Sequence, residues 1–220
     1  MSKIGNTAIV FFFVVASGLL GTAQTAKVEV IGSLSYASVP VAVRKALQPQ
    51  GYRITLDDGS VAAEIWLRRG VAAQEKKEVP GAIYSQLAES TLVGVISFPT
   101  AATDYRGQSI KPGTYTLRYA LLPNDGNHLG VAPNRDFLLL IPAASDPDPD
   151  ATYKFQQLVR LSCQATGTAH PGPMSLVQPQ NGTEAGISKD EDEHWIFSTK
   201  LTVGSADLPF SFVVKGTAPQ

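Results

Sequence analysis

One stretch of the chain, from Gly94 to Ile141, limits the possible fold more than any other. Its residues 114–121 alternate, with Tyr115, Leu117, Tyr119 and Leu121 on one side and Thr114, Thr116, Arg118 and Ala120 on the other. A period of two predicts a strand with one buried face. Residues 137–141 (FLLLI) are apolar throughout, which is typical of a strand covered on both faces. The two runs therefore predict a pair of strands at the centre of the core.

Shorter runs of the same kind recur along the chain and are separated by turn residues. Further strands are expected at residues 27–31, 52–56, 62–67, 92–98, 174–177, 195–203 and 210–215. The strand at 174–177 is expected at a sheet edge, because Pro179 follows it. Residues 179–193 are expected to form a polar loop.

Two segments change to a helical period, residues 39–48 and 151–165. Asp150 is the expected N-cap of the second helix, and Gly167 its C-terminal cap. The strands are joined mostly by turns, without regular strand–helix alternation. This pattern predicts a mainly β fold, an antiparallel β-sandwich or jelly-roll-like body with two short helices. We expect residues 27–220 to form a single β-rich domain, within which 27–81 could be a small strand–helix–hairpin lobe.

The first 26 residues have the three parts of a secretory signal peptide. Lys3 is followed by a thirteen-residue apolar run, Ala8 to Leu20, and then by small residues at Gly21 and Ala23. The run is shorter than the roughly 20 residues that span a bilayer. The sequence therefore predicts cleavage near Ala23 or Ala26 and a secreted or periplasmic mature protein without a membrane span.

The charge and the cysteine content of the chain exclude some functions and some kinds of covalent stabilisation. Without Lys3 the chain has 17 basic and 19 acidic residues and no dense basic stripe, which argues against nucleic-acid binding. Cys163 is the single cysteine, so an intramolecular disulfide is excluded, and within a helix it is expected to be a core residue. An exported domain of this size can bury a core without disulfides. These features favour a bacterial source.

Asp146, Asp148 and Asp150 resemble the start of a calcium loop. That motif requires glycine at position 6 and glutamate at position 12, but counting from Asp146 these positions are Ala151 and Gln157. We therefore interpret the segment as a stiff, solvated linker that ends in a helix cap, with an incidental calcium site as the alternative.

His128 and His194 are the residues with which a metal-dependent chemistry would be built. Asp125 and Asp136 lie on either side of His128, and His194 follows four acids, Asp190 to Glu193. If these loops converge, they would form a histidine–carboxylate metal site; otherwise the histidines are surface loop residues. The nucleophile elbow and the glycine-rich phosphate loop are both missing from the sequence. We predict no catalytic residue, no metal and no cofactor.

Three loops are the expected contact surface. The aromatic side chains in loops or at element ends either pack in the core and its rim or, as the alternative, stack on sugars or fill a partner's pocket. Tyr105 is the strongest aromatic candidate, beside Tyr84 and Tyr153. The expected loops are Thr100–Ile110, Pro123–Pro133 and Gly182–Glu193. The candidate binding residues are Tyr105, Asp125, His128 and His194.

Two short motifs carry a resemblance to a known group. They are residues 64–70 (EIWLRRG) and residues 110–117 (IKPGTYTL). The chain resembles exported bacterial proteins with a β-sandwich domain of unknown function, in which a tryptophan-and-arginine segment precedes a strand with proline or alanine, glycine, any residue and tyrosine. The resemblance covers about residues 62–122. It implies a sandwich fold and export, and it transfers no activity and no functional residue.

Three hypotheses follow for function. The leading one is a non-catalytic, exported β-sandwich protein of the cell envelope that binds an unidentified envelope ligand or protein partner, or has a structural role. The first alternative is a metal-dependent enzyme or metal-binding protein that uses His128 and His194 with nearby carboxylates. The second alternative is an accessory subunit of an envelope complex.

Overall fold

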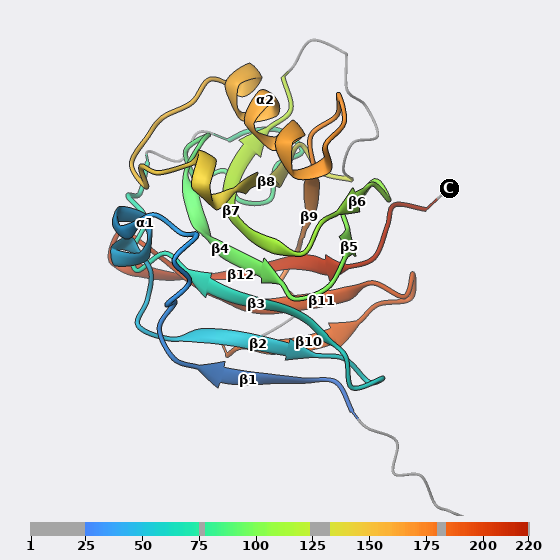
Figure 1. Ribbon diagram of the computed structural model, residues 1–220. Coiled ribbons are helices and arrows are strands. Elements are labelled where there is room, and N and C mark those ends of the chain that lie inside the picture. Colours follow the sequence, from blue (N-terminus) through green and yellow to red (C-terminus); the bar gives the residue numbers. More distant parts are fainter. Residues whose placement is uncertain (1–24, 75–77, 124–132, 180–183, 220) are drawn as a thin grey trace, which may run out of the picture.

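The computed structural model describes residues 25–74, 78–123, 133–179 and 184–219. Strands dominate the fold, and Figure 1 shows α1 at one side of them and α2 across one end. The elements are β1 (Lys27–Ile31), α1 (Val41–Ala46), β2 (Gly51–Thr55), β3 (Val61–Leu67), β4 (Leu92–Phe98), β5 (Ala102–Thr103), β6 (Ser109–Ile110), β7 (Gly113–Leu121), β8 (Asp136–Pro142), the 3-10 turn η1 (Ala143–Ser145), α2 (Phe155–Thr166), β9 (Pro173–Val177), β10 (Gly186–Lys189), β11 (Trp195–Val203) and β12 (Ala206–Lys215).

Ten of these strands form one antiparallel sheet in the order β1-β2-β3-β4-β7-β8-β9-β12-β11-β10. The sheet curls until its edge strands β1 and β10 approach each other, so it is nearly barrel-shaped. The predicted mainly β, antiparallel class is confirmed. The predicted sandwich of two separate sheets is not observed; instead, a single twisted sheet wraps around one interior. Register shifts in the β2–β3, β4–β7 and β11–β12 pairs increase the local twist that this curling requires.

The interior of the curled sheet is the main core. From β7, the side chains of Tyr115, Leu117 and Tyr119 point into it, as the alternation predicts. They meet aromatic rings from β11 and β12, among them Phe197 and Phe212, whose ring centroids are 5.9 Å apart. Each large apolar side chain buried here contributes roughly 1.5–3 kcal/mol.

The prediction that β7 has only one buried face is wrong. Thr116, Arg118 and Ala120 on its other face are also buried, because residues 143–151 and α2 cover the outside of the sheet there. The prediction that the next strand is covered on both faces is confirmed. Leu138 and Leu140 of β8 point into the interior, and the alternate residues of β8 pack beneath α2.

The second helix begins later than predicted. It runs from Phe155 to Thr166, and Lys154 rather than Asp150 precedes it; the Gln157 Oε1 atom accepts a hydrogen bond from the Lys154 N–H at 2.8 Å. Asp150 instead forms an ion pair with Arg68. Gly167 ends the helix at φ 67, as predicted. Within the described ranges, no helix has the length and apolar character that a membrane crossing requires.

The first helix is also shorter than the predicted 39–48, because only residues 41–46 are helical. Its Val43 packs on the outside of the sheet against Trp66, which donates a hydrogen bond from Nε1 to the Gly32 carbonyl at 2.9 Å.

The C-terminal strands hold two further differences. The predicted edge strand is β9, which lies inside the sheet between β8 and β12. Pro173 is its first residue, where the missing N–H of proline is tolerated. Part of the predicted loop 179–193 is β10, which pairs with β11 and forms a sheet edge.

Candidate binding site

The structure brings two of the four predicted binding residues together. The rings of Tyr105 and His194 lie with their centroids 5.6 Å apart, and both residues are buried rather than exposed. Asp125 and His128 lie outside the described residues. Asp136 is buried elsewhere, where its carboxylate accepts hydrogen bonds from the backbone N–H groups of Ile83 and Tyr84.

Both ring nitrogens of His194 are engaged. Nδ1 lies 3.0 Å from Asp190 Oδ2, and Nε2 lies 2.9 Å from the Thr217 carbonyl oxygen. With both nitrogens directed at protein oxygens, the ring presents neither nitrogen to a metal ion. Among the described residues, no group of three or more histidine, cysteine, aspartate and glutamate side chains could hold a metal ion.

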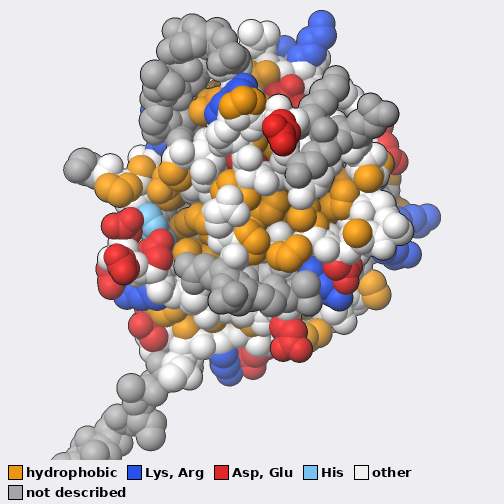
Figure 2. All heavy atoms as spheres, turned by 180° about the vertical axis from the view of Figure 1, so that it is seen from behind, with side chains coloured by type: hydrophobic (Ala, Val, Ile, Leu, Met, Phe, Trp, Pro, Cys, Tyr) orange, Lys and Arg blue, Asp and Glu red, His pale blue; other side chains and the backbone are white. Residues whose placement is uncertain are grey.

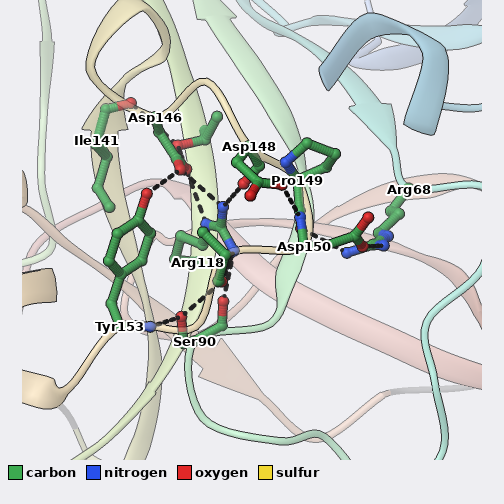
Figure 3. A network of polar contacts seen from close by, with 11 residues as sticks. Arg68, Ser90, Arg118, Ile141, Asp146, Asp148, Pro149, Asp150 and Tyr153 are labelled. Carbon is green, nitrogen blue, oxygen red and sulfur yellow. Dashed lines mark hydrogen bonds and ion pairs between the residues drawn. The ribbon is translucent and has the colours of Figure 1, made fainter. Parts of the chain in front are cut away.

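Asp146, expected in a solvated linker, is fully buried, and it forms an ion pair with Arg118 (Figure 3). The contact is bidentate: Arg118 donates from Nε to Oδ2 at 2.8 Å and from Nη2 to Oδ1 at 2.7 Å. The hydroxyls of Thr116 and Tyr153 donate to the same carboxylate at 2.7 and 3.1 Å. The first acid of the Asp-Pro-Asp-Pro-Asp segment is therefore an internal anchor, not a cation ligand.

The remaining donors of Arg118 are used as well. They reach the carbonyl oxygens of Ser90, Asp148 and Ala151 at 2.8, 2.6 and 3.0 Å. All five guanidinium N–H groups are then occupied. Arg118 fastens two segments, the loop at Ser90 and residues 146–151, to the outer face of β7 and has no donor left for a ligand. The sequence signal for this role is an arginine within an alternating strand that is followed along the chain by a strand apolar on both faces.

Asp104 is a second buried acid in a structural role. It accepts hydrogen bonds from the backbone N–H groups of Arg106 and Gln108 at 3.0 and 2.8 Å. Burial raises the pKa of Asp104, and these hydrogen bonds oppose the shift. The carboxylate shapes the tip of the β5–β6 hairpin.

A pocket of about 380 Å³ lies where the β2–β3 turn, the β5–β6 hairpin and the end of β12 meet. We call it the end pocket. Its size is within the range of small-molecule sites. The end pocket is lined by Leu56, Ser60, Val61, Ala62, Thr100, Ala101, Ala102, Thr103, Ser109, Val214 and Lys215.

The end pocket combines an apolar floor with polar groups at its rim. Leu56 and Val214 are buried core residues, whereas Ser60 and Lys215 are exposed. Among the described residues, no carboxylate forms an ion pair with Lys215. Hydrogen bonds from Ser60 lower the pKa of neighbouring Asp58, and the charge of Lys215 adds a smaller contribution. The pocket is therefore lined by apolar side chains, by side chains that carry hydroxyl groups, and by Lys215, whose charge also acts on Asp58.

Sequence reasoning names part of this pocket, because residues 100–103 and 109 belong to the expected contact loop 100–110. It misses the contributions of β2, β3 and β12, which only the folded sheet brings to the same place.

Seen from behind relative to Figure 1, the surface of the molecule has apolar side chains gathered in the middle of the face, with acidic and basic side chains around them (Figure 2).

Comparison with known proteins finds no match for this chain, whether among protein-family models, curated proteins or solved structures. The resemblance to exported bacterial β-sandwich proteins therefore stays a prediction.

Proposed function

We propose that this protein is an exported, non-catalytic binding protein of the bacterial cell envelope and that the end pocket is its ligand site. The observation that carries the proposal is the combination of a buried apolar floor, a hydroxyl-bearing rim and the Lys215 ammonium in one hollow of ligand size. The buried acids Asp104, Asp136 and Asp146 accept hydrogen bonds from main-chain or side-chain donors. This supports a binding role over acid–base chemistry.

The lining indicates an amphipathic ligand with an anionic head. Its apolar body would pack on Leu56 and Val214, and its head would lie near Lys215, where an ammonium group favours negative charge. The hydroxyls of Thr103 and Ser109 can donate to or accept from polar groups of the ligand.

The binding test uses 1-anilinonaphthalene-8-sulfonate, an aromatic sulfonate whose fluorescence rises in apolar surroundings. We expect saturable binding to one site on the full mature chain. Ala62→Trp and Ala101→Trp fill the pocket and should abolish binding, and Lys215→Met should weaken it. Ala144→Trp, at an exposed position on η1, is the matched control. Unchanged binding in both pocket variants, with folding verified by circular dichroism, would refute the assignment.

Export has a separate test. The full chain is expressed in a bacterial host, and the N-terminus of the protein in the periplasmic extract is sequenced. The expected first residue is Gln24 or Lys27, the residues that follow Ala23 and Ala26. A protein that keeps Met1 and stays inside the cell would contradict the proposed location.

A further inference from the structure

Residues 216–219 follow β12 and contact the tip of the β5–β6 hairpin at Tyr105 and Gly107; we call them the tail segment. Two hydrogen bonds hold it: the Thr217 carbonyl lies 2.9 Å from His194 Nε2, and the Ala218 N–H donates to the Tyr105 carbonyl at 2.7 Å. Gly216 packs directly on the imidazole, since a Cβ atom there would lie 2.4 Å from His194 Cδ2. The tail segment is therefore seated on the histidine ring.

The contacts of His194 require a particular protonation state. Each ring nitrogen faces an oxygen that only accepts, the Asp190 carboxylate on one side and the Thr217 carbonyl on the other. A neutral imidazole carries one N–H, so only the imidazolium donates to both. The other groups around the ring are Tyr105, in ring contact, and Asp192, which adds negative charge.

Loss of one proton leaves the ring with a single donor. A hydrogen bond to a carboxylate is stronger than one to a neutral carbonyl, so the remaining proton stays on Nδ1, toward Asp190. The lone pair of Nε2 then faces the carbonyl oxygen of Thr217, and two acceptors repel each other. The contact that holds the tail segment is the one that is lost.

We propose that His194 is a pH-dependent latch for the tail segment and that this latch controls the shape of the end pocket. The second part rests on the proposed function. The coupling is structural. The Tyr105 carbonyl, which accepts the hydrogen bond from the Ala218 N–H, belongs to the β5–β6 hairpin, and Thr103 and Ser109 of the same hairpin line the pocket. Lys215, two residues before Thr217, lines the same pocket.

The direction of the pH effect follows from the surroundings of the ring. Burial opposes the charged form of His194, but the hydrogen bonds that the ring donates to the Thr217 carbonyl and the Asp190 carboxylate outweigh it, and the pKa of His194 is raised. The latch is thus fully closed below the ordinary histidine pKa of about 6.5, and it opens as the pH rises through the higher pKa of the folded state. A closed latch keeps the pocket walls in place, so an anionic amphiphile should bind more tightly at acidic pH.

Nuclear magnetic resonance tests the latch on the full mature chain. The amide signals of Thr217 and Ala218 are followed from about pH 5 to pH 9, across the histidine range. We expect a transition with its midpoint above about 6.5. His194→Gln should remove the transition, and His170→Gln, at an exposed histidine, should not. Amides that do not titrate, or that titrate equally in His194→Gln, would overturn the latch.

Asp190→Asn is the sharper variant. Asp190 Oδ1 accepts hydrogen bonds from the backbone N–H groups of Asp192 and His194, and an amide oxygen can do the same. The new amide nitrogen would donate to Nδ1, so a neutral imidazole with its proton on Nε2 satisfies both contacts. We therefore expect the tail segment to stay closed in this variant throughout the alkaline range, a result that a purely structural carboxylate would not produce. Loss of the closed signals at neutral pH would overturn the mechanism.

Binding of 1-anilinonaphthalene-8-sulfonate at about pH 5.5 and pH 8.5, on either side of the range in which histidine changes charge, tests the coupling. We expect binding at acidic pH to be tighter by about fivefold or more, and Asp190→Asn to remove the difference. Absence of binding at both pH values would refute the proposed function and leave the latch standing. Equal affinity at both, with titrating Thr217 and Ala218 amides, would overturn the coupling alone.

Discussion

Asp146→Asn isolates the contribution of the buried ion pair behind β7. The substitution preserves the size of the side chain and removes its charge. Arg118 then keeps a positive charge with only 1% of its side chain exposed. Its Nε and Nη2 donors meet one carbonyl oxygen and one amide group in place of two carboxylate oxygens, and the hydroxyls of Thr116 and Tyr153 lose a charged acceptor.

The magnitude follows from this burial. Removing one partner of a buried ion pair costs about 3–5 kcal/mol, because the other charge is left uncompensated. For a domain of this length, each kcal/mol lowers the melting temperature by about 2–4 °C. We therefore expect Asp146→Asn to melt about 6–20 °C below the wild type.

Urea unfolding of the mature chain near neutral pH measures the loss of unfolding free energy. The midpoint should fall while the m-value, which reports the surface exposed on unfolding, stays the same. Asp150→Asn is the matched control, because Asp150 belongs to the same segment, pairs with Arg68 and has 75% of its side chain exposed. Exposed ion pairs contribute only about 0–1 kcal/mol. If Asp146→Asn costs no more than Asp150→Asn, the assignment of Arg118 and Asp146 as the internal anchor is wrong.

Three further outcomes are expected. Gly94→Ala should destabilise the fold by about 1–3 kcal/mol in thermal unfolding, because its Cβ atom would lie 2.4 Å from the Trp66 carbonyl oxygen. Gly186→Ala is the control, because the space around Gly186 is open and no destabilisation is expected. Equal effects of the two substitutions would contradict the close approach of β3 and β4. Burial raises the pKa of the Cys163 thiol, so iodoacetamide should label native protein more slowly than urea-unfolded protein, and equal rates would contradict this. The difference in unfolding free energy between wild type and His194→Gln should be largest below about pH 6.5 and shrink at alkaline pH, because the pKa of His194 is raised on folding. Urea unfolding at acidic and alkaline pH measures this difference. A difference that stays constant would contradict the charged latch.

Local patterns in the sequence are sufficient to place most of the strands. The alternation at 114–121 and the apolar run at 137–141 predict β7 and β8, whose observed bounds are Gly113–Leu121 and Asp136–Pro142. Gly167 predicts the end of α2, because glycine adopts the left-handed conformation without a Cβ clash. These features depend on neighbouring residues alone.

The tertiary structure decides what lies against each strand. An alternating strand shows which residues share a face, but it does not show that a distant segment covers the second face, as residues 143–151 cover Arg118. For the same reason, the sequence predicts that Asp146, an acid in a proline-rich segment, is solvated, whereas the structure buries it.

The candidate site is also a product of the fold. The sequence by itself determined that a β-rich core forms, but residues 100–110, which it predicts as a loop, contain the short paired strands β5 and β6. The curling of the sheet decided that this hairpin, the β2–β3 turn and the end of β12 enclose one pocket. It also placed His194 beside Thr217, 23 residues later. The physical reason is that strand formation follows from local side-chain periodicity, whereas sheet closure and pairing depend on contacts between residues far apart in the chain.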